Sequence, residues 1–188
     1  MKVLKFTALV GVIITLLSCG GGTSKQSANA EGFAVLEKEI KSKFGDEAYF
    51  TDLSIAYNKS IGNIIGVTVT EDPESLKMGQ WNLSQDNWTQ NSEISLEVPE
   101  GTKAVDFMFQ LNEKITLSKL GELVESSCKQ LKEEKNIENP ILSMAQIKFP
   151  KNGDITKTEY IVIIIPENGG TNFIFSYELN GDFIGLNY

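Results

Sequence analysis

The feature that most constrains the fold is an order of sequence patterns that occurs twice. Each time, an amphipathic helix is followed by short segments in which apolar and polar residues alternate. The first helix is predicted where apolar residues recur at steps of three and four, before a glycine that is placed to end it: Phe33, Leu36, Ile40, Phe44 and Gly45. The second helix is predicted from about residue 117 to 135.

Eight alternating segments predict strands, four behind each helix. The Asn180-Gly181 pair predicts a tight hairpin of the type I′ kind. We therefore predict an α+β fold in which two helix-ββββ units form an antiparallel sheet with both helices on one face. The body is predicted as one domain, 31–188, of two similar halves, 31–113 and 114–188. The predicted strands are 49–57, 64–70, 92–98, 104–111, 141–149, 160–166, 172–179 and 183–188.

This order of elements is similar to that of the small PepSY-type and β-lactamase-inhibitor-like domains of secreted and lipid-anchored bacterial proteins. The resemblance concerns the order of helices and strands, and no shared motif accompanies it. It implies an α+β module of the cell envelope, and it implies no particular reaction.

The two halves differ by about twenty residues, 72–91, which the first half inserts between its second and third predicted strands. Extra length of this kind favours a functional loop. The segment holds both tryptophans of the chain, Trp81 and Trp88, together with Asn82 and Asn87. Rings and amides in this mixture can stack on a sugar or press against a protein partner. The alternative is a structural hairpin whose indoles pack across strands or cover the sheet.

The N-terminal residues predict a secretion signal. Lys2 and Lys5 precede an apolar run, 6–17, that is too short to span a bilayer. The run leads into Leu16-Leu17-Ser18-Cys19, which resembles the lipobox of bacterial lipoproteins. The resemblance implies that residues 1–18 are removed and that Cys19 becomes a lipidated N-terminus.

The residues after Cys19 are small and polar, and they predict a flexible tether over 19–30. Several acyl chains on one cysteine suffice for stable membrane anchoring. Because Gly20 follows the cysteine, resemblance to lipoprotein sorting in bacteria with two membranes implies the outer membrane as the destination.

The composition excludes several function classes. The chain has no histidine and no arginine, and its formal charge is −8. The missing histidine removes Ser-His-Asp and Cys-His activation and the HExxH zinc helix. The missing arginine removes the bidentate group for phosphate, and an acidic body repels nucleic acid. With Cys19 lipidated, Cys128 has no disulfide partner, and its helical spacing predicts a buried core position.

We therefore expect a lipid-anchored binding or accessory module with no catalytic residues, cofactor, metal or nucleic-acid partner. Its predicted partners are the membrane and a protein or glycan. An inhibitor-like or structural envelope domain is the alternative. An enzyme that acts on glycans would need two facing carboxylates, and no such pair is recognisable in the sequence.

Overall fold

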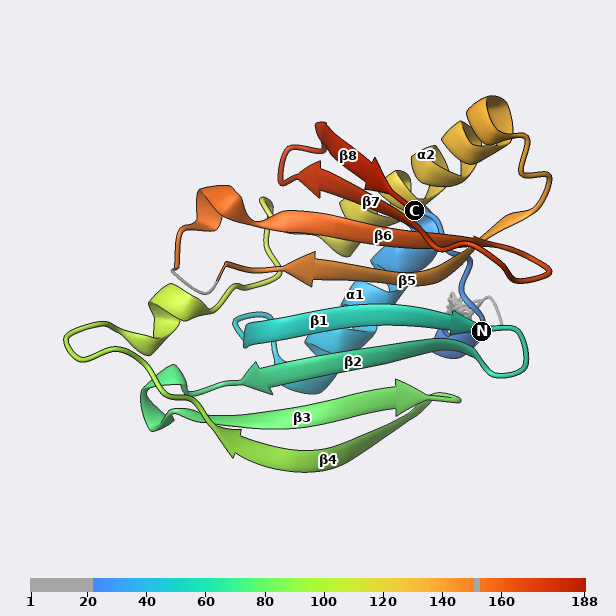
Figure 1. The fold of residues 1–188 in the computed structure, drawn as a ribbon. Coiled ribbons are helices and arrows are strands. Elements are labelled where there is room, and N and C mark those ends of the chain that lie inside the picture. Colours follow the sequence, from blue (N-terminus) through green and yellow to red (C-terminus); the bar gives the residue numbers. More distant parts are fainter. Residues whose placement is uncertain (1–21, 151–152) are drawn as a thin grey trace, which may run out of the picture.

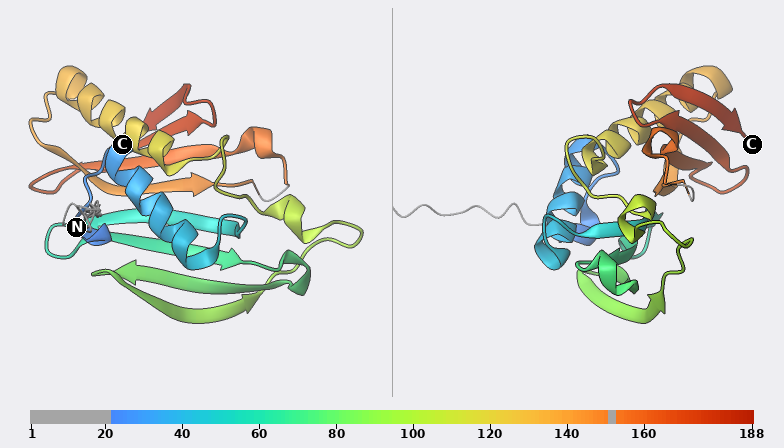
Figure 2. Two further views of the ribbon diagram at one scale, coloured as in Figure 1. Left: turned by 180° about the vertical axis from the view of Figure 1, so that it is seen from behind. Right: turned by 90° about the vertical axis from the view of Figure 1, so that its left-hand side faces the viewer.

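The computed structural model describes residues 22–150 and 153–188, so the predicted signal peptide and Cys19 lie outside the described residues. Two helices cover one face of an eight-stranded antiparallel sheet, which confirms the predicted α+β class (Figures 1 and 2). The helices are α1 (Ala30–Phe44) and α2 (Leu117–Lys135). The strands are β1 (Tyr49–Asn58), β2 (Gly62–Thr70), β3 (Lys77–Ser84), β4 (Asn87–Ser95), β5 (Pro140–Lys148), β6 (Glu159–Pro166), β7 (Phe173–Glu178) and β8 (Phe183–Asn187).

Each half forms a four-stranded meander, and the two meanders join in the middle of the sheet. The strand order is β4-β3-β2-β1-β5-β6-β7-β8, so the first strand of one half pairs with the first strand of the other (Figure 1). At this junction Leu53 lies opposite Ile147 and Ile55 opposite Ala145, all buried beneath the helices. The predicted duplication of helix and four strands is therefore the architecture of the sheet.

The two helices cross closely and cap one another. A Cβ at Gly121 in α2 would overlap the backbone of Asn29 at the start of α1. Glu37 of α1 accepts a hydrogen bond from the Leu117 N–H in the first turn of α2, at 2.8 Å. Glu125 of α2 accepts one from the Ala30 N–H in the first turn of α1, at 3.2 Å. Each helix thus supplies a carboxylate to the start of the other helix. There the backbone N–H groups have no partner within the helix, and the helix dipole is positive.

The C-terminal half follows the predicted strands closely. In the N-terminal half, β1 and β2 confirm the predicted strands 49–57 and 64–70, but the later predictions fail, and β4 overlaps the predicted strand 92–98 only in part. Residues 72–91, predicted as an insertion, contain β3 and the start of β4. The turn between them is formed by Gln85 and Asp86, both with positive φ angles, 49° and 63°. Two such residues form the tight turn that suits a hairpin. The segment is therefore part of the four-strand unit, and the prediction of extra length was wrong.

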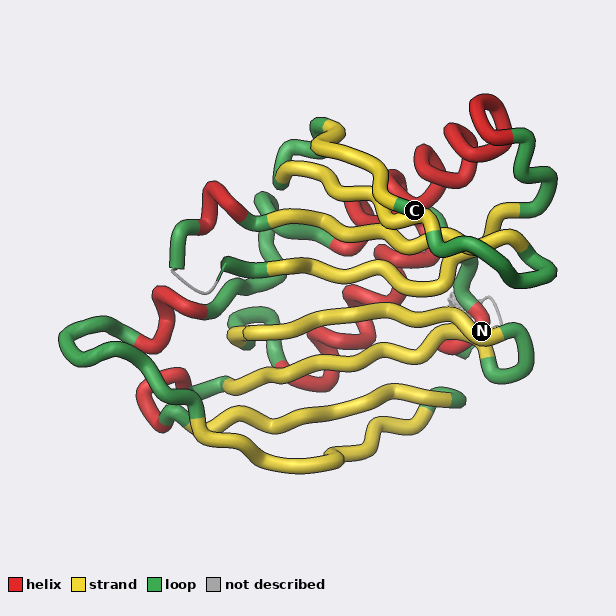
Figure 3. Tube along the Cα trace, viewed as in Figure 1, coloured by secondary structure: helices red, strands yellow, loops and turns green. Residues whose placement is uncertain are grey.

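The strand predicted over 104–111 was also wrong. This stretch forms a short 3-10 helix, Ala104–Phe107, and then a single bridge between Phe109 and Phe50 of β1. Its apolar side chains serve two different cores. Ala104 and Met108 pack with Met78 on the sheet face opposite the helices, whereas Phe109 joins the core beneath them. Apolar and polar residues alternate in 104–111 because the apolar side chains pack into these two cores. The stretch is not a strand (Figure 3).

The main core lies between the helices and the sheet. Phe33, Leu36 and Ile40 of α1 and Leu120 of α2 are fully buried there. The Ser127 hydroxyl of α2 reaches into this core and hydrogen-bonds the Tyr177 hydroxyl of β7 at 2.7 Å. The opposite side of the sheet, which we call the open face, is covered by neither α1 nor α2 (Figure 2).

We predict that Glu37→Ala lowers the free energy of unfolding by about 1–3 kcal/mol, because it leaves a half-buried helix donor without its acceptor. The Glu37 side chain is 14% exposed and also binds Lys41 at 2.7 Å. Urea denaturation would measure the loss. The matched control is Glu122→Ala in α2, since Glu122 makes only an exposed ion pair with Lys119 and should cost less than about 0.5 kcal/mol. Equal losses in the two variants would contradict the capping role.

Candidate functional site

The two predicted binding tryptophans lie on the helix side of the sheet, against the end of α1. The ring of Phe44 meets the ring of Trp81 edge-on at 5.7 Å and that of Trp88 at 4.9 Å. The indole N–H of Trp88 donates to Glu39 at 3.0 Å, and the Lys43 ammonium lies 4.7 Å from the Trp81 ring centre. Both indoles are half-buried and extend the core to the outer strands. This is the geometry of the structural alternative, a hairpin closed by its aromatic residues.

The predicted amides do not share a surface with the indoles. In the β3–β4 register, Leu83 lies opposite Trp88, so both point toward the helices. Successive strand residues point to opposite faces, and Asn82 and Asn87 therefore lie on the open-face side. Asn87 donates from its side chain to the Gln85 carbonyl oxygen at 2.8 Å, within the turn. The four residues predicted as one cluster are split by the pleat of the sheet.

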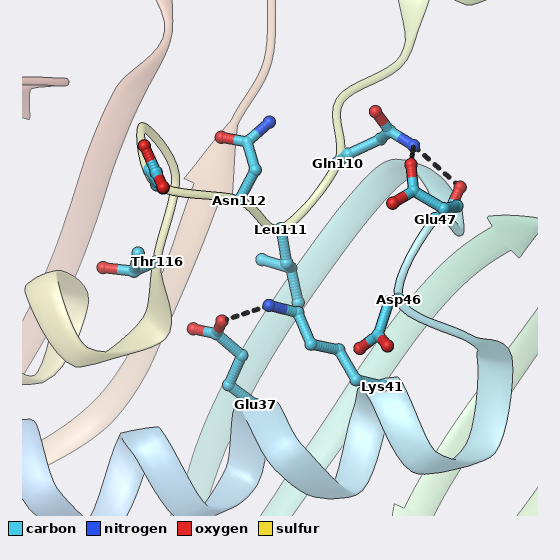
Figure 4. A pocket seen from close by; sticks show the side chains of 9 residues that line it. Glu37, Lys41, Asp46, Glu47, Gln110, Leu111, Asn112 and Thr116 are labelled. Carbon is cyan, nitrogen blue, oxygen red and sulfur yellow. Dashed lines mark hydrogen bonds and ion pairs between the residues drawn. The ribbon is translucent and has the colours of Figure 1, made fainter.

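A cavity of about 470 Å³ lies between α1 and the segment that enters α2 (Figure 4). Its walls are polar, but the polar groups at its base are engaged with each other. Glu37 binds Lys41 and the Leu117 N–H, as described above. Gln110 donates to the backbone carbonyl oxygen of Glu47 at 2.8 Å. We therefore interpret this cavity as the solvent-facing surface beside the Glu37 cap of α2, and not as a binding site.

A second cavity, of about 380 Å³, contains Cys128 and lies between α2, the start of β5 and the segment before α1. Cys128 is half-buried. The sequence analysis therefore predicted its helix face correctly but predicted a more deeply buried position than the structure shows. Its thiol lies 3.7 Å from the Pro140 carbonyl oxygen. Burial raises the pKa of the Cys128 thiol to about 11, with a further contribution from Glu125 and an opposing one from Lys132. A thiol with this pKa is a poor nucleophile near neutral pH.

The open face differs between the halves. In the C-terminal half, apolar side chains pair across β5, β6 and β7: Met144 lies opposite Ile163, and Ile163 opposite Ile174. With Ile165 they form what we call the isoleucine patch, and all four are half-buried. In the N-terminal half, the same face carries one polar cross-strand row, Thr68, Gln80 and Ser92, beside the apolar cluster around Met78 that Ala104 and Met108 cover. Sequence analysis missed this patch, although its signal was present: β6 is apolar on both faces.

Within residues 22–150 and 153–188, no three side chains of His, Cys, Asp or Glu gather in a group that could hold a metal ion. Neither described helix has the length and apolar character that crossing a membrane requires.

We predict that Trp81→Ala and Trp88→Ala each lower the free energy of unfolding by about 3 kcal/mol, the lower end of the range for buried aromatics, because both rings extend the core. The control is Tyr188→Ala, an aromatic that is 73% exposed. Denaturation midpoints would measure all three. If the tryptophan variants were as stable as the control, the indoles would be free for ligand binding instead.

We also predict that Cys128 reacts slowly with a disulfide reagent at pH 8, because a pKa of about 11 leaves only about 0.1% thiolate. The pKa is raised, so the rate should rise about tenfold per pH unit below that value. Denaturant should increase the rate about 100-fold. In the control, Cys128→Ser with Ser126→Cys moves the thiol to the exposed face of α2. Equally rapid reaction of both proteins would contradict the burial.

Comparison with known proteins gives little further guidance. No protein-family model and no curated protein matches the chain. Among solved structures, the chain is similar to a candidate lipoprotein (CD1622) of Clostridium difficile 630. The identity is 14%, the alignment covers 80% of this chain and 88% of that one, and the TM-score is 0.48. A likeness at this level carries no argument about function.

Proposed function

We propose that this chain is a lipid-anchored, non-catalytic binding module of the bacterial cell envelope, and that it holds a protein partner on the open face of its sheet. The proposal joins two independent features. Leu16-Leu17-Ser18-Cys19 has the form of a lipid-attachment signal. The α-helices α1 and α2 both cover the same face of the sheet.

The isoleucine patch is the observation that supports the proposal most strongly. A sheet face that meets only water normally carries polar side chains. In the N-terminal half, Thr68, Gln80 and Ser92 form a polar row, and the apolar cluster around Met78 is covered by Ala104 and Met108 of the same chain. The C-terminal half departs from this rule, since Met144, Ile163 and Ile174 form a continuous apolar row. Apolar surface bordered by polar surface is typical of protein interfaces.

The competing functions have weaker support. Glycan binding through stacking would require exposed rings, whereas Trp81 and Trp88 are packed against Phe44. A glycan-acting enzyme would require two carboxylates across a cleft. The buried carboxylate best placed for such a role, Glu37, is held by Lys41 and the Leu117 N–H. A structural or inhibitory domain would use the same surface and differ only in its partner.

The site of anchoring is the cell envelope in this proposal. Lipidation of Cys19 places the protein on a membrane surface. Gly20 after the cysteine favours the outer membrane where the cell has two membranes.

The test is photo-crosslinking from both faces of the full chain in envelope preparations. A photoreactive amino acid at Ile163 should give one defined crosslinked protein, and the same amino acid at Val35 should not, because Val35 is exposed on α1. Adding Ile174→Lys should lower the yield about tenfold, equivalent to about 1.4 kcal/mol of lost contact. Val35→Lys is the matched control and should leave the yield unchanged.

The anchor is tested in the same cells. Cys19→Ala should abolish palmitate labelling and release the protein from the membrane pellet, because no thiol remains for the lipid. Unchanged labelling would contradict the anchor. Equal crosslinking from Ile163 and Val35, or none from either, would contradict binding on the open face.

A further inference from the structure

The segment predicted as a flexible tether is in contact with the body over most of its length. Residues 22–29, which we call the docked arm, lie against the ends of β1, β2 and β3 before α1 begins (Figure 1). The arm includes a short 3-10 helix, Thr23–Lys25. It leads directly into α1, whose N-cap, Asn29, accepts a hydrogen bond from the Gly32 N–H at 2.8 Å.

Specific hydrogen bonds hold the arm at two points. The Ser24 N–H donates to the Asp86 carboxylate in the β3–β4 turn at 2.8 Å, and Ser24 is only 4% exposed. The Gln26 carbonyl oxygen accepts from the side chain of Asn63 in β2 at 2.7 Å. Asn63 is 1% exposed. A bond to a buried amide is costly to break, because it leaves a buried donor without a partner.

The arm also approaches the sheet more closely than side chains normally allow. Gly62 begins β2 with a φ of 82°, a conformation that favours glycine, and a Cβ there would overlap the Ser24 carbonyl oxygen. The arm is therefore packed at backbone distance. Together with the hydrogen bonds to Asp86 and Asn63, this packing leaves no flexible joint between Gly22 and α1.

The docked arm marks one end of the sheet. Asp86 belongs to the β3–β4 turn, and Ser24 shares a cavity of about 410 Å³ with the β1–β2 turn. Lys59 of the β1–β2 turn binds Glu167 after β6 at 3.1 Å. These turns form what we call the anchored end. Figure 1 shows that the segment from 96 to 115 lies at the opposite end of the strands.

We propose that the docked arm fixes the orientation of the protein on its membrane, with the anchored end against the lipid surface. This inference rests on the proposed lipidation of Cys19. Two residues, Gly20 and Gly21, separate Cys19 from Gly22, so the link between Cys19 and Gly22 spans at most about 10 Å. A free tether over 19–30 would instead let the body rotate at distances of about 20 Å.

This orientation has a consequence for the binding face. The strands lead away from the membrane, and β1 with ten residues is about 33 Å long. The open face therefore stands upright on the membrane, accessible to a partner from the side. The anchored end suits an interfacial position through Tyr57, 39% exposed, and Tyr188, 73% exposed, since tyrosine tolerates the boundary between water and lipid. In this proposal the covalent lipid supplies the attraction to the membrane.

The test uses the lipidated full chain in phosphatidylcholine vesicles that contain a nitroxide-headgroup lipid. In a Cys128→Ala background, a fluorophore is placed at Ser60→Cys in the anchored end or at Glu100→Cys in the opposite end, both exposed positions. We expect several-fold stronger quenching at position 60 than at position 100. A third protein carries about twelve extra Gly/Ser residues before Gly22, which lengthen the link to about 19 Å. In this protein the difference between the two positions should disappear.

The outcomes separate this inference from the proposed function. Palmitate labelling of Cys19 is measured on the same preparations. Labelling with equal quenching at positions 60 and 100 would overturn the fixed orientation and leave the anchor in place. A chain without palmitate would overturn both, since the orientation requires the anchor. An unchanged difference after the Gly/Ser insertion would also overturn the role of the short link.

Discussion

The pairing of β1 with β5 is the interaction on which the rest of the structure depends. Each half of the chain is a meander with one apolar face, and a meander alone would expose two strand edges. Joining the first strand of each half removes one edge from each and aligns the two apolar faces. Leu53 and Ile55 then meet Ile147 and Ala145 in one continuous floor for the helices. The two halves have a common core only because this pair forms.

The helix layer follows from that floor. Two helices placed side by side on one curved sheet bring their N-terminal turns near each other, where backbone N–H groups have no partners within the helix. Glu37 and Glu125 supply these partners. Each lies in the middle of one helix and accepts a hydrogen bond from a backbone N–H at the start of the other. The close crossing at Gly121 makes these contacts short enough to form. The half-buried Glu37 and the exposed Glu125 therefore have a structural role as helix caps.

The faces of the sheet that the helices do not cover have diverged between the halves. One half carries the polar row of Thr68, Gln80 and Ser92 and a covered apolar cluster around Met78, whereas the other half carries the isoleucine patch. The two halves share the same arrangement of strands but differ in the side chains on this face. The fold therefore does not require the apolar surface of the C-terminal half. This contrast supports the proposed recognition role of the apolar half. In the proposed orientation, the docked arm sets the direction of that half relative to the membrane.

Local pattern in the sequence determined both helices, the strands of the C-terminal half and the α+β class, because these elements each bury a single face and show it as a clear period. It also determined the candidate anchor at Cys19 and the exclusion of histidine-dependent chemistry. Strand β3 and the start of β4 were missed because they lie within 72–91, which was interpreted as an insertion, and the side chains of β4 are mostly exposed and carry almost no apolar period. Residues 104–111 were misread because their apolar side chains serve two cores on opposite faces of the sheet.

Only the tertiary structure decided the role of the remaining residues, because each depends on contacts between segments far apart in the chain. The pleat separated Trp81 and Trp88 from Asn82 and Asn87, and α1 gave the indoles their partner in Phe44. The small polar residues of 22–29 have the composition of a free linker, yet Asp86 and Asn63 hold them from other strands. Composition reports what a segment can do by itself, whereas the fold supplies the donors, acceptors and close surfaces that decide what it does.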